Sequence, residues 1–134
     1  MPHLIVEYSE NLASDLDARA MMKQIADAAI STGVFPVAGL RGRCFPAKDY
    51  WVADGHPDNA FLHLTVKVGH GRDIETRRRA GETIFKALCD FFADISARRP
   101  LALSMEMIEF HPELIFRHGN MSDHMAARRP SAGE

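Results

Sequence analysis

The order strand, helix, strand occurs twice in this chain, and this repeat restricts the fold more than any other feature of the sequence. The first unit opens with the apolar run in MPHLIVEYSE and continues with a helical pattern that starts at Ser14 and Asp17 and stops before Gly33. It closes with AGLRGRCF, whose alternating side chains are typical of a strand. The helical part has apolar residues at the spacing of one buried face: Ala18, Met21, Met22, Ile25, Ala28 and Ala29.

The second unit follows the same order. FLHLTVKV alternates as a strand, GHGRD turns the chain, and a long helix runs to ARRP. LALSMEMIEF then alternates as the last strand. Between the units, AKDYWVADGHPDNA is polar and rich in turn residues, with a short strand around residues 50–52 as one interpretation. The predicted buried face of the long helix carries Ile84, Leu88, Phe91, Phe92 and Ile95.

These patterns predict an α+β fold in which two βαβ units form one four-stranded mixed sheet with both helices on one face. With 134 residues, of which 46% are hydrophobic, the chain has one core and no third layer for the other sheet face. We therefore expect oligomerisation through that face in a closed cyclic assembly. Residues 1–116 form the predicted domain, and 117–134 form a tail that packs on a neighbouring subunit or is disordered at its end.

Charge and composition exclude several classes of protein. Sixteen Lys and Arg against eighteen Asp and Glu give a net charge of −2, which argues against nucleic-acid binding. No signal peptide and no apolar run long enough for a membrane span are evident, so we expect a cytoplasmic protein. Cys44 and Cys89 lack metal-ligand spacing and are expected to be buried free thiols.

Pro2 has two interpretations. Proline suits the first residue of a strand, where no ladder donor is needed. Alternatively, removal of Met1 exposes a secondary amine that acts as a base when it is unprotonated. A free α-amine has a pKa near 8, and burial or nearby cations lower it, so a terminal proline in a pocket with arginines is a usable base at neutral pH.

Arg41 and Arg72 are the cations that the predicted topology brings toward Pro2. Arg41 begins a strand parallel to the first one, and Arg72 follows a strand antiparallel to it, so all three residues are expected at one end of the sheet. Together they would form one base and two carboxylate-binding forks, with a neighbouring subunit able to supply one of them. Arg43 shares the strand face of Arg41, and the structural alternative is that both of these arginines face solvent or a partner's carboxylate.

Other chemistry finds less support in the sequence. The histidines show no metal-ligand spacing, and no nucleotide or redox fingerprint is present, so we expect neither a metal nor a cofactor. Four carboxylates are candidates for an acid pair but lie on separate predicted elements: Asp54, Asp58, Glu106 and Glu109.

The sequence resembles the 5-carboxymethyl-2-hydroxymuconate delta-isomerases of the tautomerase superfamily. The motifs that carry the resemblance are MPHLIVEYSENL, TGVFPVAGLRGR, ADGHPDNAFLHLTVKVGHGR, RRAGETIF and LALSMEMIEFHP. The resemblance implies a tautomerase-like fold, a homotrimer, no cofactor, and an isomerase in 4-hydroxyphenylacetate degradation through homoprotocatechuate. By motif, its catalytic proline corresponds to Pro2 and its arginines to Arg41 and Arg72.

The implied reaction agrees with the chemistry of these residues. Neutral Pro2 would take the enol hydroxyl proton of 5-carboxymethyl-2-hydroxymuconate and return it at a distant carbon, giving the 2-oxo-hexenedioate isomer. Arg41 and Arg72 would bind the carboxylates of this dianionic or trianionic substrate, and Trp51 would belong to an apolar wall that keeps Pro2 unprotonated. Two alternatives are a tautomerase of another 2-hydroxydienoate or phenylpyruvate-type enol, and a non-catalytic ferredoxin-like ligand-binding module.

Overall fold

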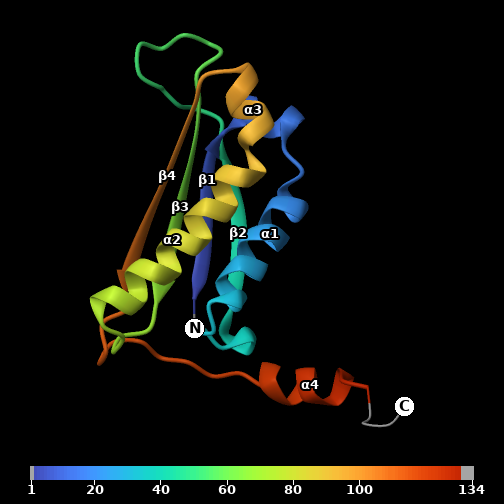
Figure 1. The fold of residues 1–134 in the computed structure, drawn as a ribbon, viewed down its shortest axis with the longest axis vertical. Coiled ribbons are helices and arrows are strands. Elements are labelled where there is room, and N and C mark those ends of the chain that lie inside the picture. Colours follow the sequence, from blue (N-terminus) through green and yellow to red (C-terminus); the bar gives the residue numbers. More distant parts are fainter. Residues whose placement is uncertain (1, 131–134) are drawn as a thin grey trace.

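Four strands form one mixed sheet in the order β2-β1-β3-β4 (Figure 1). The computed structural model describes residues 2–130. β1 and β2 are parallel, β3 and β4 are parallel, and β1 is antiparallel to β3, as expected for two βαβ units related by a pseudo-two-fold axis. The predicted α+β fold is therefore confirmed. The strands are β1 (His3–Ser9), β2 (Arg41–Ala47), β3 (Ala60–Val68) and β4 (Leu101–Glu109).

Both long helices, α1 (Ala18–Ser31) and α2 (Ile74–Phe91), cover the same face of the sheet (Figure 1). Asp17 caps α1, since its side chain accepts a hydrogen bond from the Ala20 backbone N–H at 3.0 Å. The helix expected to run on to ARRP is divided at Phe92, after which the short α3 (Ala93–Arg98) follows. The fully buried core lies between helices and sheet and includes Leu4, Val6, Met21, Ile25, Leu62, Leu64, Val66, Ile84, Leu88 and Phe92.

Within residues 2–130, no helix lies over the other face of the sheet (Figure 1). Alternation along the strands places His3, Ile5 and Glu7 of β1 on this face, and the register sets His3 between Arg41 of β2 and Lys67 of β3. The absence of a covering layer within residues 2–130 agrees with the expectation from chain length. We call this surface the open sheet face.

The connection between β2 and β3 differs from one interpretation of the sequence. Residues 50–52 form no strand, so the short strand considered there is wrong. Ala53, with φ 54°, and Gly55, with φ 81°, adopt left-handed backbone conformations, which turn the chain too sharply for strand pairing. Cys44 and Cys89 are free thiols, as predicted, although both are half-buried rather than buried.

The C-terminal segment, residues 110–128, leaves the end of β4 and crosses the end of the sheet where β1 begins (Figure 1). It contains a helix that the sequence analysis did not predict, α4 (Met121–Arg128), which lies against the 3-10 helix η2 (Val37–Gly39). Leu114 and Phe116 in this segment are 67% and 84% exposed. The disorder expected at the end of the tail falls on residues 131–134, which lie outside the described residues.

No helix within residues 2–130 combines the length and the apolar character that crossing a membrane requires.

Candidate active site

The starts of β1 and β2 and the ends of β3 and β4 lie at one end of the sheet, because of the strand directions. This is where Pro2, Arg41 and Arg72 were expected to meet. Pro2 is buried, and its carbonyl accepts a hydrogen bond of 2.9 Å from the Arg41 backbone N–H. The predicted neighbourhood of Pro2 and Arg41 is therefore confirmed, and it follows from parallel pairing of β1 with β2.

Arg41 is half-buried, and the loop before it holds its side chain. Nη1 donates to the carbonyl of Ala38 at 2.8 Å and to that of Leu40 at 3.1 Å. Among the contacts of residues 2–130, these two bonds occupy Nη1 and leave Nε and Nη2 to bind a ligand. The guanidinium is thus oriented in advance and keeps donors for a carboxylate.

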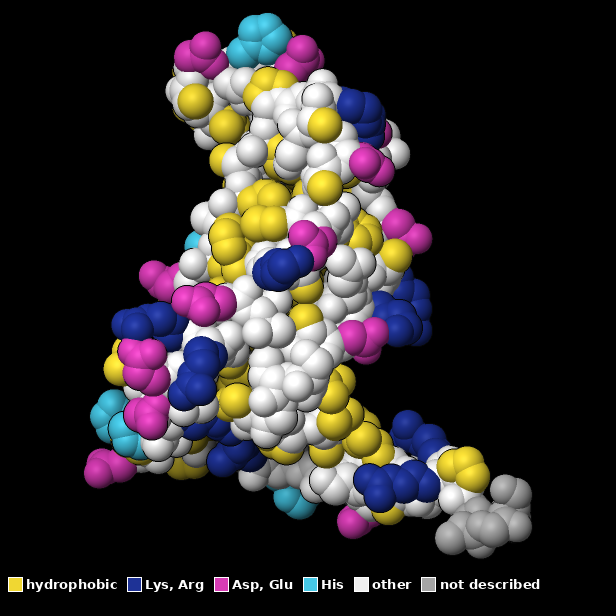
Figure 2. Space-filling view, in the orientation of Figure 1, with side chains coloured by type: hydrophobic (Ala, Val, Ile, Leu, Met, Phe, Trp, Pro, Cys, Tyr) yellow, Lys and Arg dark blue, Asp and Glu magenta, His cyan; other side chains and the backbone are white. Residues whose placement is uncertain are grey.

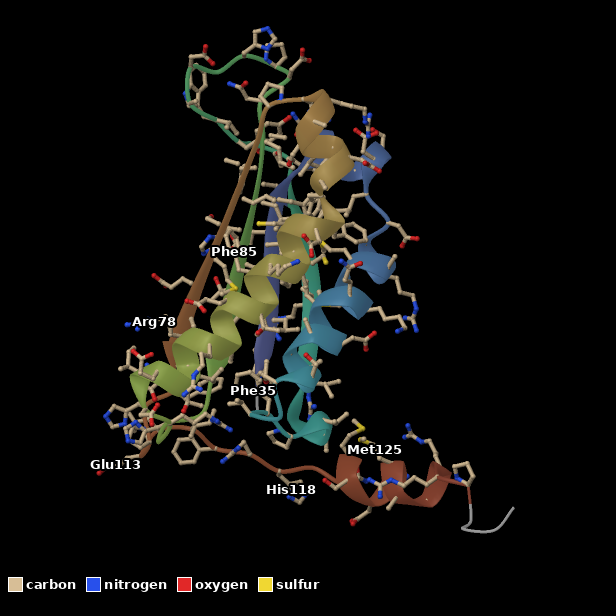
Figure 3. All side chains as sticks on the ribbon, in the orientation of Figure 1. Phe35, Arg78, Phe85, Glu113, His118 and Met125 are labelled. Atoms are coloured by element: carbon tan, nitrogen blue, oxygen red, sulfur yellow. The ribbon has the colours of Figure 1, made fainter. Side chains whose placement is uncertain are left out.

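Arg72 holds the same loop from the other side. Nε and Nη2 donate to the Val34 carbonyl at 3.2 and 2.9 Å, and Nη1 donates to the Gly69 carbonyl at 3.2 Å. The guanidinium carbon lies 5.2 Å from the ring centroid of buried Phe35, which Figure 3 labels at this end of the molecule. The two arginines therefore fix residues 34–40 at the end of the sheet that holds Pro2.

A cavity of about 800 Å³ opens at this end, between the strand starts and the C-terminal segment. His3 and Arg41 line it from the sheet, and Phe110 with residues 115–123 closes it from the C-terminal segment. From the loop it is lined by Pro36, Ala38 and Gly39. Figure 2 shows this segment leaving the body of the molecule, with hydrophobic side chains where it joins. The volume and the flanking arginine suit a small anionic molecule.

Trp51 does not reach this cavity within one chain. It belongs to the β2–β3 connection at the opposite end of the sheet (Figure 1), because β2 runs away from Pro2. Its side chain is 76% exposed, and Nε1 donates to the Ala53 carbonyl at 2.8 Å. A contact between Trp51 and Pro2 thus requires a second copy of the chain.

The remaining candidates also stay apart. Glu109 at the end of β4 pairs with Arg77 at 3.3 Å, whereas Asp54 and Asp58 lie in the β2–β3 connection at the other end of the sheet. Within residues 2–130, no three His, Cys, Asp or Glu side chains gather as metal ligands would.

Comparison with known proteins decides the family. A sequence profile described as 5-carboxymethyl-2-hydroxymuconate isomerase matches residues 2–125. The chain belongs to this family. It is 40% identical over 121 residues to the 5-carboxymethyl-2-hydroxymuconate Delta-isomerase of Escherichia coli, an alignment that covers 90% of this chain and 96% of that protein. The resemblance seen in the sequence motifs is therefore confirmed, and with it the prediction of an isomerase at the level of the family.

Solved structures of the isomerase family and one more distant solved structure share the fold. A crystal structure of 5-carboxymethyl-2-hydroxymuconate delta-isomerase superposes with a TM-score of 0.86 at 32% identity, covering 98% of this chain and 95% of that one. At the level of fold alone, a fused 4-OT described as a symmetric trimer matches with a TM-score of 0.57 at 13% identity, covering 84% of this chain and 91% of that one. The tautomerase-like fold of the isomerase family is thus the fold of this chain.

His3 is a cavity residue that the sequence analysis did not select. Its ring lies edge-on to Phe110, with ring centroids 5.5 Å apart, and its Nδ1 lies 2.9 Å from Nη1 of Arg43. Partial burial lowers the pKa of His3. Three nearby cations lower it further, because they disfavour the positive charge of the protonated ring: Arg43, Arg41 and Lys67. Its position directly after Pro2, on the strand face opposite the core, was the signal in the sequence that could have identified it.

Proposed function

We propose that this chain isomerises 5-carboxymethyl-2-hydroxymuconate to its 2-oxo-hexenedioate isomer without a cofactor, with Pro2 as general base. The observation that supports this most is the backbone hydrogen bond that sets buried Pro2 beside Arg41, a residue that lines the cavity. Pro2 supplies the base and Arg41 a carboxylate fork, while the related Escherichia coli protein carries the name of this reaction.

Pro2 is a base only in a chain that begins with it. After removal of Met1, its nitrogen is a secondary amine whose lone pair accepts the proton of the 2-hydroxyl group. Burial disfavours the charged form of an amine, and so does the positive charge of a nearby guanidinium. The proton returns at a distant carbon of the dienol, so that the hydroxyl becomes a ketone and the remaining double bond is conjugated with it.

Arg41 and Arg72 bind the substrate through the donors that the loop carbonyls do not use. On Arg72, Nε, Nη1 and Nη2 each donate once to the backbone, and the second N–H groups of Nη1 and Nη2 form an edge that fits one carboxylate. Negative charge develops on the 2-oxygen as its proton leaves. A guanidinium held in place by the protein stabilises this charge without reorganising.

We infer a homotrimer as the working assembly. The open sheet face lacks a cover within residues 2–130, and a protein of the same fold is described as a symmetric trimer. A neighbouring copy in such a ring would bring Trp51 from the far end of its own sheet toward the cavity. The cytoplasmic location, the role in degradation of aromatic compounds and the division into residues 1–116 and a tail stay predictions.

The test is ultraviolet-monitored isomerisation of 5-carboxymethyl-2-hydroxymuconate by a sample whose intact mass is known, beside Pro2→Ala. We expect the protein without Met1 to turn over the substrate and the variant to lose at least about 100-fold in kcat, the size of a general-base contribution. The variant should keep the thermal midpoint of the wild type.

Two results would contradict the proposal. Near-full activity of folded Pro2→Ala would exclude the proline base. Correctly processed, folded wild type without turnover would exclude this substrate, and other 2-hydroxydienoates and phenylpyruvate-type enols would then be assayed, followed by binding measurements for a non-catalytic module.

A further inference from the structure

His3 carries chemistry that the proposed mechanism does not use. It lines the same cavity as Arg41, on the open sheet face, with Arg41 opposite it on β2 and Lys67 opposite it on β3. A half-buried imidazole beside an anion-binding cavity is either a structural link between strands or a group that contacts the ligand. The hydrogen bond to Arg43 bears on this question, because it determines which ring nitrogen carries the proton.

The bond to Arg43 sets the proton on the imidazole ring. A guanidinium has only N–H donors, so Nδ1 of His3, which lies 2.9 Å from Nη1 of Arg43, must accept the hydrogen bond and carries no proton. The ring is then neutral, with its one N–H on Nε2. Positive groups surround it, namely Arg41 and Arg43 on β2 and Lys67 on β3, and they disfavour a second proton.

The ring is also held in place on its other side. Phe110 lies edge-on to it at 77°, and the ammonium group of Lys67 lies 5.0 Å from the centre of the same Phe110 ring. Arg43 and Phe110 therefore restrict the imidazole from two directions. A fixed neutral ring presents one donor of known position, which is the kind of group that gives specificity in a small-molecule site.

We propose that His3 is a substrate-binding residue of this site, whose Nε2–H donates to a carboxylate oxygen of the anionic substrate. The inference rests on the proposed function, because it assigns one more contact to the same anionic substrate. A neutral donor adds a directed hydrogen bond without adding a cation that would compete with the arginines for the carboxylates.

Two amide variants separate this role from a structural one. The amide of asparagine reaches about as far as Nδ1 of histidine, and that of glutamine about as far as Nε2. His3→Asn can therefore keep the bond to Arg43 but loses the distal donor, whereas His3→Gln keeps the distal donor. We expect His3→Asn to raise KM about tenfold with kcat changed less than about threefold, and His3→Gln to stay within about threefold of the wild-type KM.

A purely structural role predicts the opposite order, with His3→Asn resembling the wild type and His3→Gln impaired, and that order would overturn the proposal. Equal impairment of both variants with a lowered thermal midpoint would overturn it as well. The ¹⁵N shifts of the His3 ring in the wild type at pH 7 give a test without substrate. The proposal requires the Nε2–H tautomer, and a Nδ1–H or doubly protonated ring contradicts it.

Measuring substrate affinity by calorimetry tests the role of His3 separately from the proposed reaction. In the Pro2→Ala background, the affinity for 5-carboxymethyl-2-hydroxymuconate should fall about tenfold on His3→Asn and stay within about threefold on His3→Gln. Failure of the wild type to turn over the substrate would contradict the proposed reaction and leave this comparison of affinities valid. Equal affinities of Pro2→Ala and of its His3→Asn and His3→Gln derivatives would contradict substrate binding by His3 but would leave the proposed reaction untouched.

Discussion

At the scale of single residues, the two arginines of the proposed site, Arg41 and Arg72, bind backbone carbonyls as well as carrying charge. Arg72 bonds two carbonyls that lie 35 residues apart in the sequence, those of Val34 and Gly69, and stacks on Phe35. A planar guanidinium can make all these contacts at once, whereas an ammonium group is a single charge at the end of a flexible chain. A lysine at position 72 would therefore keep the charge but could not make these contacts.

Arg72→Lys tests this point. The variant keeps the positive charge but loses the fork to Val34 and the stacking on Phe35, so we expect kcat/KM to fall at least about tenfold. Steady-state isomerisation kinetics measure it. Arg79→Lys is the matched control, because Arg79 is exposed on α2, and it should leave kcat/KM unchanged. Equal activity of both variants would show that charge alone suffices at position 72.

At the scale of elements, the loop that carries Arg72 is tied to both α2 and β4. Nε of Arg77, in the first turn of α2, donates to the Arg72 carbonyl at 3.1 Å, and Nη1 of Arg77 lies 3.3 Å from Oε1 of Glu109 at the end of β4. Arg77 and Glu109 are about three-quarters buried. In the proposed site, Arg77 and Glu109 would therefore be positioning residues that act through Arg72.

Glu109→Gln should loosen this link. We expect KM to rise about threefold and stability to fall by less than about 1 kcal/mol, because the amide keeps the size of the side chain while the ion pair becomes an ordinary hydrogen bond. Kinetics and thermal denaturation check the two effects. Glu75→Gln removes the carboxylate that pairs with exposed Arg78 on the same helix and serves as control. An unchanged KM in Glu109→Gln would rule out the positioning role.

At the scale of the whole molecule, the described residues form a sheet with α1 and α2 over one face and no helix over the other (Figure 1). Within residues 2–130 the open sheet face combines apolar Ile5 with charged Arg43 and Lys67, a mixture that a second copy of the chain can cover. The same end of the sheet holds the cavity. In the proposed trimer, a neighbouring copy that covers this face would also complete the site beside the cavity.

Ile5→Asp should separate the copies. A carboxylate in the centre of the open sheet face would lose its hydration on assembly, at a cost that can exceed the attraction of nearby Arg43, so we expect light scattering to report monomers and isomerase activity to fall with the trimer. Thr83→Asp, at an exposed position of α2 on the helix side, should leave the mass unchanged. A trimer of full mass in Ile5→Asp would show that the interface lies elsewhere.

The sequence by itself determined the order of the four strands and the two long helices, the sides on which their side chains lie, and the end of the sheet that holds Pro2, Arg41 and Arg72. Periodicity encodes the first two locally, and the strand directions of two βαβ units imply the third. Only the tertiary structure decided the distance of Trp51 from Pro2, the crossing of the C-terminal segment and the bond between His3 and Arg43. These features depend on contacts between residues far apart in the chain, which arise from strand register and loop conformation rather than from any local pattern.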